Sequence, residues 1–254
     1  MSHTATLSLQ NKVALVAGAS RNLGAAIATE LAEAGAAVVI HFNSASSQHD
    51  ALSLVETLKS AGHRAHAIQA DLRRVDEVQR LFTEAKAAFG RLDIAVNCVG
   101  KVLKKPLVEV EEAEFDEMFE INTKAAFFFI REAGRQLADG GKLINVATSL
   151  LAAFTGQYSV YAGAKAPLEH FVRAAAKEFA ARGISVNNVA PGPLDTPFFY
   201  SAETPEAVAY LKSASMNGQL GQTRDIAPIV RFLAGEGWWI NGQTLLANGG
   251  FVTR

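Results

Sequence analysis

Tyr161 and Lys165 are a pair whose residue types and spacing could support acid–base chemistry. They stand four residues apart in YAGAK (161–165), so on a helix they share one face, with Cβ atoms roughly 5–6 Å apart. A phenol, with an ordinary pKa of about 10, is a poor acid–base group at neutral pH, and a neighbouring ammonium lowers that pKa by favouring phenolate. The same spacing is common in ordinary helices, so the pair indicates catalysis only if a cofactor or substrate site accompanies it.

A possible cofactor site lies near the start of the chain. Gly18 and Gly24 bracket a turn in AGASRNLG (17–24). Its backbone N–H groups, at the positive end of a following helix, can hold a pyrophosphate. The spacing departs from the common G-x-G-x-x-G fingerprint, because Asn22 stands where another glycine is expected. Asparagine tolerates the left-handed backbone conformation, so the turn remains feasible.

The end of the second predicted strand favours one of the two nicotinamide cofactors. Sites that prefer NAD generally carry an acid about 20 residues after the turn, whereas this chain has HFNS (41–44) there and no acid before Asp50. Arg21 supplies a planar cation, and Asn43 and Ser44 supply hydrogen bonds, which suit a 2′-phosphate. The sequence therefore predicts NADP(H) rather than NAD(H).

Short apolar runs alternate with helical patterns along the whole chain and would position these groups. Most of the runs are apolar on consecutive positions, as expected for strands covered on both faces. Helical segments such as 25–35 and 75–90 end at a glycine. The alternation predicts βαβ units, and so an α/β fold of Rossmann type: a doubly wound, parallel, seven-stranded sheet with helices on both faces. The predicted strands are 12–17, 36–42, 64–70, 92–97, 141–147, 183–190 and 242–248.

One domain is predicted to span residues 1–254, since no long linker or repeat divides the chain. The irregular region is about 191–223, which holds four of the seven prolines and the aromatic run Phe198, Phe199 and Tyr200. A long insertion at the carboxyl edge of an α/β sheet is usually a binding element. We expect a substrate-binding loop or lid here, with a mobile surface loop as the alternative.

Composition narrows the classes of partner. The chain is 49% hydrophobic and 19% charged, with a net charge of −1 and scattered basic residues, which argues against nucleic acid or a membrane surface as partner. Cys98 is the sole cysteine, so no intrachain disulfide forms and a cytoplasmic location fits; packing suits it better than a nucleophilic role. Neither an export signal nor a membrane span is expected, and HRAH (63–66) does not suggest a metal site.

Together the motifs resemble those of the short-chain dehydrogenase/reductase family, in its compact single-domain branch. AGASRNLG is similar to the family's TGxxxGxG turn, NCVG (97–100) to its NNAG segment and YAGAK to its YxxxK. PGPLDT (191–196) resembles the stretch that embraces the nicotinamide, and ADL (70–72) the acid near the adenine. The resemblance implies the family's fold, the cofactor NADP(H) and a homotetramer.

The resemblance also implies a set of site residues. Asn122, Thr148, Tyr161 and Lys165 match the catalytic set. Thr148 stands 13 residues before Tyr161, where the family has serine; a one-residue shift would recruit Ser149 instead, and both remain open. Tyr158 would line the substrate pocket, being too far along the helix to be tuned by Lys165. The implied cofactor contacts are Gly18, Ser20, Arg21, Asn22, Leu23, Gly24, Asn43, Ser44, Asp71, Leu72, Asn97, Gly100, Tyr161, Lys165, Pro191, Gly192, Leu194 and Thr196.

The function predicted from these residues is reversible, NADPH-dependent reduction of a ketone to a secondary alcohol. Tyr161 would donate the proton, Thr148 would orient the carbonyl, Lys165 would lower the pKa of Tyr161 and hold the nicotinamide ribose, and Asn122 would anchor a water. The aromatic residues suggest an apolar small-molecule ketone or alcohol. One alternative is a 3-oxoacyl-[acyl-carrier-protein] reductase, with Lys101, Lys104 and Lys105 as a docking patch; others are a non-catalytic NADP-binding regulator, and an epimerase or dehydratase, for which the region past 191 is short.

Overall fold

A parallel seven-stranded sheet forms the centre of the computed structural model, which describes residues 9–253. The strand order is β3-β2-β1-β4-β5-β6-β7, and every neighbouring pair is parallel. The predicted fold class and all seven predicted strands are confirmed, each within about two residues at its ends. The strands are β1 (Val13–Ala17), β2 (Ala37–Phe42), β3 (Ala65–Gln69), β4 (Ile94–Asn97), β5 (Lys142–Val146), β6 (Ser185–Pro191) and β7 (Thr244–Ala247).

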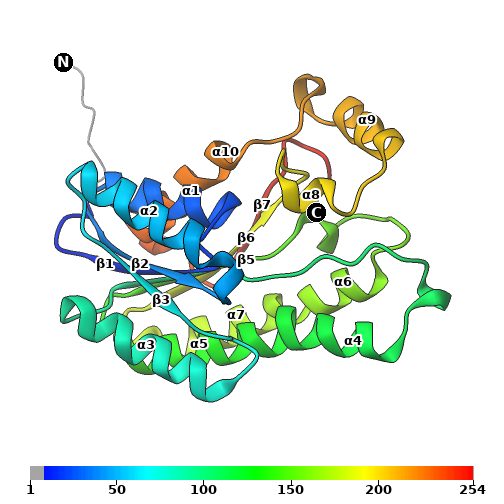
Figure 1. Ribbon diagram of the computed structural model, residues 1–254. Coiled ribbons are helices and arrows are strands. Elements are labelled where there is room, and N and C mark those ends of the chain that lie inside the picture. Colours follow the sequence, from blue (N-terminus) through cyan, green and yellow to red (C-terminus); the bar gives the residue numbers. More distant parts are fainter. Residues whose placement is uncertain (1–8, 254) are drawn as a thin grey trace.

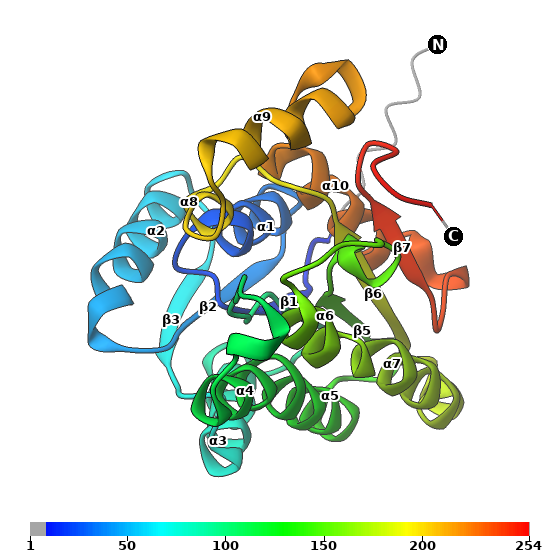
Figure 2. The same cartoon turned by 90° about the vertical axis from the view of Figure 1, so that its right-hand side faces the viewer.

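Helices cover both faces of this sheet (Figures 1 and 2). On one face α1 (Asn22–Glu33), α2 (Gln48–Ser60) and α10 (Thr223–Ala234) bury residues such as Ile27, Val55 and Val230 against the strands. The other face carries α3 (Val75–Phe89), α4 (Glu112–Phe119), α5 (Ala125–Gln136), α6 (Ser159–Lys165) and α7 (Pro167–Glu178). The strands are hydrophobic on consecutive positions because both faces are covered.

The chain changes direction across the sheet between β1 and β4. From β1 the strands run outward to β2 and β3 on one side and to β4, β5, β6 and β7 on the other. The loops leaving the carboxyl ends of β1 and β4 therefore diverge to opposite faces and leave a crevice between them. In open α/β sheets this point is where ligands bind.

The region 191–223 is more regular than its sequence suggested. It contains α8 (Pro197–Tyr200) and α9 (Pro205–Ala214), which start at the threonine caps Thr196 and Thr204. In each case the threonine hydroxyl accepts a backbone N–H and a proline occupies the first turn, an arrangement that favours helix initiation. Figure 1 shows both helices beyond the carboxyl ends of the strands. Within residues 9–253, none of the helices combines the length and apolarity that crossing a membrane requires.

Candidate active site

The turn after β1 has the backbone that a phosphate cradle needs. Gly18 has a φ of +72°, and a Cβ there would lie 3.3 Å from the backbone of Cys98. A Cβ on Gly24 would lie 2.1 Å from the carbonyl oxygen of Gly18, so only glycine permits this contact. Asn22 begins α1 with a φ of +51°, the left-handed conformation expected from the sequence. Backbone N–H groups at the start of α1 consequently face the crevice.

A cavity of about 1110 Å³ runs from this turn to the lid segment. Its walls come from the turn after β1, the ends of β2 and β3, the loops after β4 and β5, α6, and the region 191–223. It brings together most of the residues expected from the sequence. Those that line it are Gly18, Ser20, Arg21, Asn22, Leu23, Gly24, Asn43, Asp71, Leu72, Gly100, Thr148, Tyr161, Lys165, Pro191, Gly192, Leu194 and Thr196.

Three of the expected residues are absent from the cavity wall and support it from behind. Asn97 accepts the N–H of Val99 at 3.1 Å and so shapes the loop after β4. Ser44 bonds with the hydroxyl of Ser46 and caps the short turn before α2. Asn122 is fully buried, and its amide accepts from the N–H of Lys101 at 3.2 Å and donates to the carbonyl oxygen of Lys101 at 2.9 Å.

A π-helical turn explains how Asn122 reaches that loop. The π-helix Glu120–Lys124 joins α4 to α5, and π-turns inside helices are rare and frequent at functional sites. A Cβ on Gly100 would lie 3.0 Å from Oδ1 of Asn122 and 3.1 Å from Nζ of Lys165. Glycine at position 100 therefore lets the loop pass close to both side chains.

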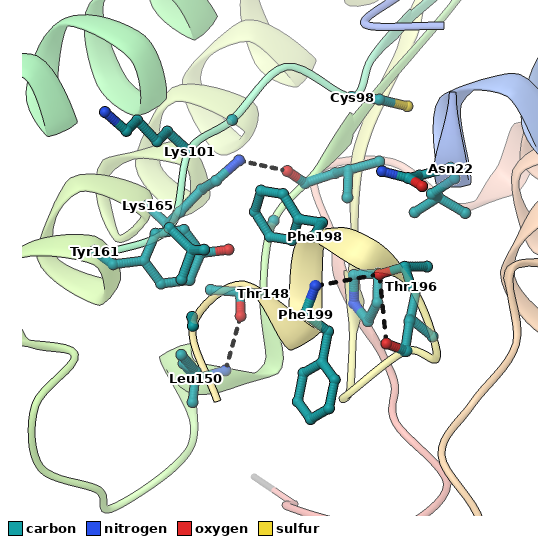
Figure 3. A pocket seen from close by; sticks show the side chains of 18 of the residues that line it. Asn22, Cys98, Lys101, Thr148, Leu150, Tyr161, Lys165, Thr196, Phe198 and Phe199 are labelled. Carbon is teal, nitrogen blue, oxygen red and sulfur yellow. Dashed lines mark hydrogen bonds between the residues drawn. The ribbon is translucent and has the colours of Figure 1, made fainter. Parts of the chain in front are cut away.

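Tyr161 presents its hydroxyl to the cavity beside Thr148 (Figure 3). The tyrosine is buried, and burial raises its pKa to about 12, against a smaller lowering from its hydrogen bond with Thr148. Desolvation penalises the phenolate, which explains the direction. At neutral pH the phenol keeps its proton and is able to donate it.

Lys165 lies on the same helix, but its ammonium points to backbone carbonyls. Nζ donates to the carbonyl oxygen of Val146 at 2.9 Å and to that of Val99 at 3.5 Å, the second bond being drawn in Figure 3. Burial lowers the pKa of Lys165 to about 8. The expectation that this ammonium lowers the pKa of Tyr161 is wrong for this structure, because burial dominates the phenol and Lys165 is engaged elsewhere.

The two candidate hydroxyls after β5 have different neighbours. Thr148 lies beside Tyr161 (Figure 3), and its Oγ1 accepts the N–H of Leu150 at 3.3 Å. Ser149 is 2% exposed and begins a short 3₁₀ turn, Ser149–Leu151. Both line the cavity, yet Thr148 is the one in contact with the phenol.

Comparisons with known proteins agree with this geometry. A family model described as Enoyl-(Acyl carrier protein) reductase matches residues 18–252. A short chain dehydrogenase, claC, from Passalora fulva is 40% identical over 95% of each chain. A hydroxynaphthalene reductase-like protein, Arp2, from Metarhizium brunneum is 39% identical over 97% of each chain. The crystal structure of a putative dehydrogenase from Burkholderia cenocepacia with bound NADP is 54% identical, with a TM-score of 0.95 over 99% of this chain and 97% of that chain.

The chain belongs to the short-chain dehydrogenase/reductase family. Its departures from the family's motifs fall at Asn22, at Cys98 and Val99, and at Thr148. Asn22 adopts the conformation a glycine would, as described above. Cys98 is partly buried at the start of the loop after β4, and desolvation raises the pKa of its thiol to about 12, which agrees with a packing residue rather than a thiolate nucleophile. Among residues 9–253 no cluster of three or more histidine, cysteine, aspartate or glutamate side chains could hold a metal ion.

This short-chain dehydrogenase/reductase also has a polar cluster that its sequence did not reveal, formed by Lys104, Tyr158 and Glu203. The hydroxyl of Tyr158 donates to Oε1 of Glu203, and Nζ of Lys104 donates to Oε2 of Glu203 at 2.5 Å. Burial raises the pKa of Tyr158, and the bond to Glu203 adds to this. All three line the cavity, as predicted for Tyr158, whose ring centroid lies 6.4 Å from that of Tyr161. Partners 45 and 99 residues apart give no local sequence signal.

His41 is a second functional candidate that sequence reasoning missed. It lies in β2, lines the cavity, and is 1% exposed. Its Nδ1 accepts the N–H of Gly18 at 3.0 Å, and Nε2 bonds with the carbonyl oxygen of Ala70 at 2.8 Å. His41 stands at the end of β2, where sites that prefer NAD carry an acid, and this position was a signal that it could contribute to the cofactor site.

The three lysines of the possible docking patch, Lys101, Lys104 and Lys105, are each paired with an acid. Lys101 bonds with Glu117 at 2.5 Å, Lys105 with Glu114 at 2.8 Å, and Lys104 with the buried carboxylate of Glu203. Local pairing cancels most of the field that an acidic partner would sense.

Proposed function

We propose that the chain is an NADPH-dependent reductase of ketones, reversible as an alcohol dehydrogenase, with Tyr161 as proton donor. The observation that carries the proposal is that Tyr161 and Thr148 lie side by side on the wall of the same cavity as the Gly18–Gly24 turn (Figure 3). A proton donor and an orienting hydroxyl beside a dinucleotide site are what carbonyl reduction requires.

NADP(H) is the cofactor. The related Burkholderia cenocepacia structure contains NADP, and the residues of this chain fit the group. The glycine cradle admits a pyrophosphate at the start of α1, where the helix dipole favours negative charge. Arg21 and Asn43 line the cavity near the end of β2. The end of β2 carries no carboxylate that would repel a 2′-phosphate. When bound, NADPH supplies the hydride.

The residues of the chain perform the remaining work. Thr148 donates to the substrate carbonyl oxygen and so fixes it beside Tyr161. Tyr161, protonated at neutral pH, delivers its proton to the developing alkoxide. Lys165 contributes a buried cation close to the loop after β4, and Asn122 holds that loop at Lys101. We also propose that Asn122 holds a water molecule and that Lys165 contacts the nicotinamide ribose.

An apolar, aromatic ketone is the substrate class that the cavity favours. Aromatic side chains gather at the lid side, where Phe198, Phe199 and Tyr210 line the wall; Figure 3 shows Phe198 facing the space beside Tyr161. The name of the relative from Metarhizium brunneum points to hydroxynaphthalenes as that protein's substrates, which supports an aryl ketone here. A homotetramer in the cytoplasm completes the proposal, on the family resemblance and the single cysteine.

The alternative functions, an acyl-carrier-protein reductase and a non-catalytic NADP-binding regulator, have less support. An acyl-carrier substrate would need free basic groups at the mouth, and Lys101, Lys104 and Lys105 are paired. A regulator that only binds NADP has no use for a phenol beside a threonine hydroxyl inside the cavity. The description of the matching family model names enoyl reduction, so an enoyl thioester belongs in any substrate panel.

Replacing Tyr161 tests the proposal. Tyr161→Phe removes the proton donor with little change of volume, and we expect kcat with an aryl ketone to fall by about 100-fold or more. Tyr158→Phe is the matched control, since it removes a hydroxyl from the same cavity and leaves Tyr161 in place. NADPH oxidation, followed by absorbance with a panel of ketones, a 3-oxoacyl thioester and an enoyl thioester, gives the readout. Near wild-type turnover by Tyr161→Phe would contradict the mechanism.

A further inference from the structure

The imidazole of His41 bridges two walls of the cofactor site. On one side Nδ1 accepts the N–H of Gly18, the first glycine of the turn, at 3.0 Å. On the other side, Nε2 donates to the carbonyl oxygen of Ala70 at 2.8 Å. Ala70 is the residue directly before Asp71. The backbone carbonyl of His41 also accepts the N–H of Ala19 at 3.0 Å. One residue of β2 thus joins the pyrophosphate turn to the end of β3.

These contacts require one protonation state. Nδ1 must carry a lone pair to accept from Gly18, and Nε2 must carry the proton to donate to Ala70, so the ring is neutral with a fixed tautomer. Burial favours this form and lowers the pKa of His41 to about 4. The bond to Ala70 and the charge of Asp71 raise the pKa by less, and the charge of Arg80 in α3 lowers it further. A protonated ring would set a second N–H against that of Gly18.

The turn depends on being held at this point. Gly18 is in the left-handed conformation, and its carbonyl oxygen is crowded by Gly24, so small movements of Gly18 displace the start of α1. The end of β3 leads into Asp71, the residue matched to the adenine side of the site. A displacement between these two walls changes the distance between the subsites for pyrophosphate and adenine.

We propose that His41 is a positioning residue for NADP(H), which locks the pyrophosphate turn and the adenine-side wall in register through its two ring nitrogens. It acts through Gly18 and Ala70 and does not touch the reacting atoms. Its loss therefore weakens cofactor binding and leaves the chemical step at saturating cofactor unchanged. The inference rests on NADP(H) binding and is independent of the identity of the ketone.

Substitutions at His41 separate its two contacts. His41→Leu removes both, and we expect the Kd for NADPH to rise roughly tenfold or more, because the buried N–H of Gly18 is left unpaired. In His41→Asn, Oδ1 replaces Nδ1 and accepts from Gly18, so most of the lost affinity should return although the bond to Ala70 is gone. Val39→Ala is the stability control, since Val39 is buried two residues earlier on the same face of β2 and does not line the cavity.

The measurements are Kd for NADPH by calorimetry, KM and kcat with an aryl ketone, and Tm for each variant. The proposal requires KM for NADPH to rise in His41→Leu while kcat holds, with rescue in His41→Asn. It is overturned if His41→Leu binds NADPH within about twofold of wild type, or if Val39→Ala loses as much affinity at equal loss of Tm. A wild-type protein without affinity for NADPH would overturn the proposed function as well, whereas normal affinity in His41→Leu overturns this inference alone.

The tautomer gives a readout that does not depend on activity. In protein labelled with ¹⁵N-histidine, the His41 resonances, assigned by their absence in His41→Asn, should show a proton on Nε2 and a lone pair on Nδ1 from pH 7.5 down to pH 5.5. Exposed His66 gives a second imidazole signal in the same sample and serves as the internal reference. Protonation of His41 near pH 6.5, or a proton on Nδ1, would contradict the proposal.

Discussion

Thr148 and Ser149 stand next to each other after β5 but have different partners. The hydroxyl of Thr148 lies beside the phenol of Tyr161 and accepts from Leu150, while Ser149 is buried at the start of a 3₁₀ turn. A hydroxyl that already meets the proton donor is able to meet a carbonyl oxygen placed between them. We infer that Thr148 takes the place of the family's serine.

Alanine substitutions separate these two residues. Thr148→Ala removes a donor to the developing oxyanion, and we expect kcat to fall by about 100-fold, a typical effect of removing one such donor. Ser149→Ala should leave kcat near the wild-type value. Steady-state kinetics with saturating NADPH and an aryl ketone provide the measurement, and Tm shows whether either variant is folded. A larger loss in Ser149→Ala would mean that the hydroxyl is recruited one residue later.

The residues that could be predicted from the sequence share a local signal. Tyr161 and Lys165 are related by helical spacing, and Gly18, Asn22 and Gly24 by the requirements of a tight turn. The raised pKa of Tyr161 could not be predicted, because it depends on how deeply the folded chain buries the ring. Contacts between distant segments were missed for a similar reason: nothing near Glu203 in sequence indicates that Tyr158 and Lys104 will meet it.

At the level of elements, the region 191–223 is tied down at two places. Its base is closed by the bridge between Leu194 and Gly221, and by Asp195, which accepts from Tyr200 at 2.7 Å and from Gln222 at 3.1 Å. Its far attachment lies between α8 and α9, where Glu203 meets Tyr158 and Lys104 on the opposite wall of the cavity. The four prolines of the region indicated a loop, and the threonine caps that start α8 and α9 were overlooked although both stand directly before a proline.

Removing the far attachment should loosen α8 and α9. Glu203→Gln weakens the bonds to Tyr158 and Lys104, and since hydrogen bonds to charged groups contribute about 1.5–3 kcal/mol, we expect amide exchange in 197–214 to quicken by about tenfold or more. KM for the ketone should rise, because the wall on the lid side is no longer fixed. Hydrogen exchange by mass spectrometry gives the measurement.

Glu206→Gln is the matched control for that variant. It removes the same charge from exposed Glu206 in the first turn of α9 and leaves the cavity wall untouched. Equal acceleration in both variants would show that charge on α9, rather than the contact with Tyr158 and Lys104, governs the opening of this region.

At the level of the whole molecule, the fold brings its two functional halves together at the sheet's switch point. The cofactor turn belongs to the half formed by β1, β2 and β3, while Thr148, Tyr161 and Lys165 come from the half that begins with β4. Strand alternation made this division predictable, since consecutive apolar runs between helical patterns demand a doubly wound sheet. A ligand that spans both halves is expected to stabilise the entire domain, because it binds the folded chain and not the unfolded one.

NADPH should raise Tm more than NADH does at equal concentration, because the predicted cofactor preference gives NADPH the lower Kd. A ligand at 100 times its Kd adds about 2.7 kcal/mol, which for a chain of this size corresponds to roughly 5–10 °C. We expect the 2′-phosphate of NADPH to gain a partner in Arg21, which lines the cavity at the start of α1, so Arg21→Ala should shrink the NADPH shift toward that of NADH and leave the NADH shift unchanged. Thermal unfolding with a titration of each cofactor tests this. Equal shifts from both cofactors in the wild type would refute the assigned preference, and an unchanged NADPH shift in Arg21→Ala would exclude Arg21 as its source.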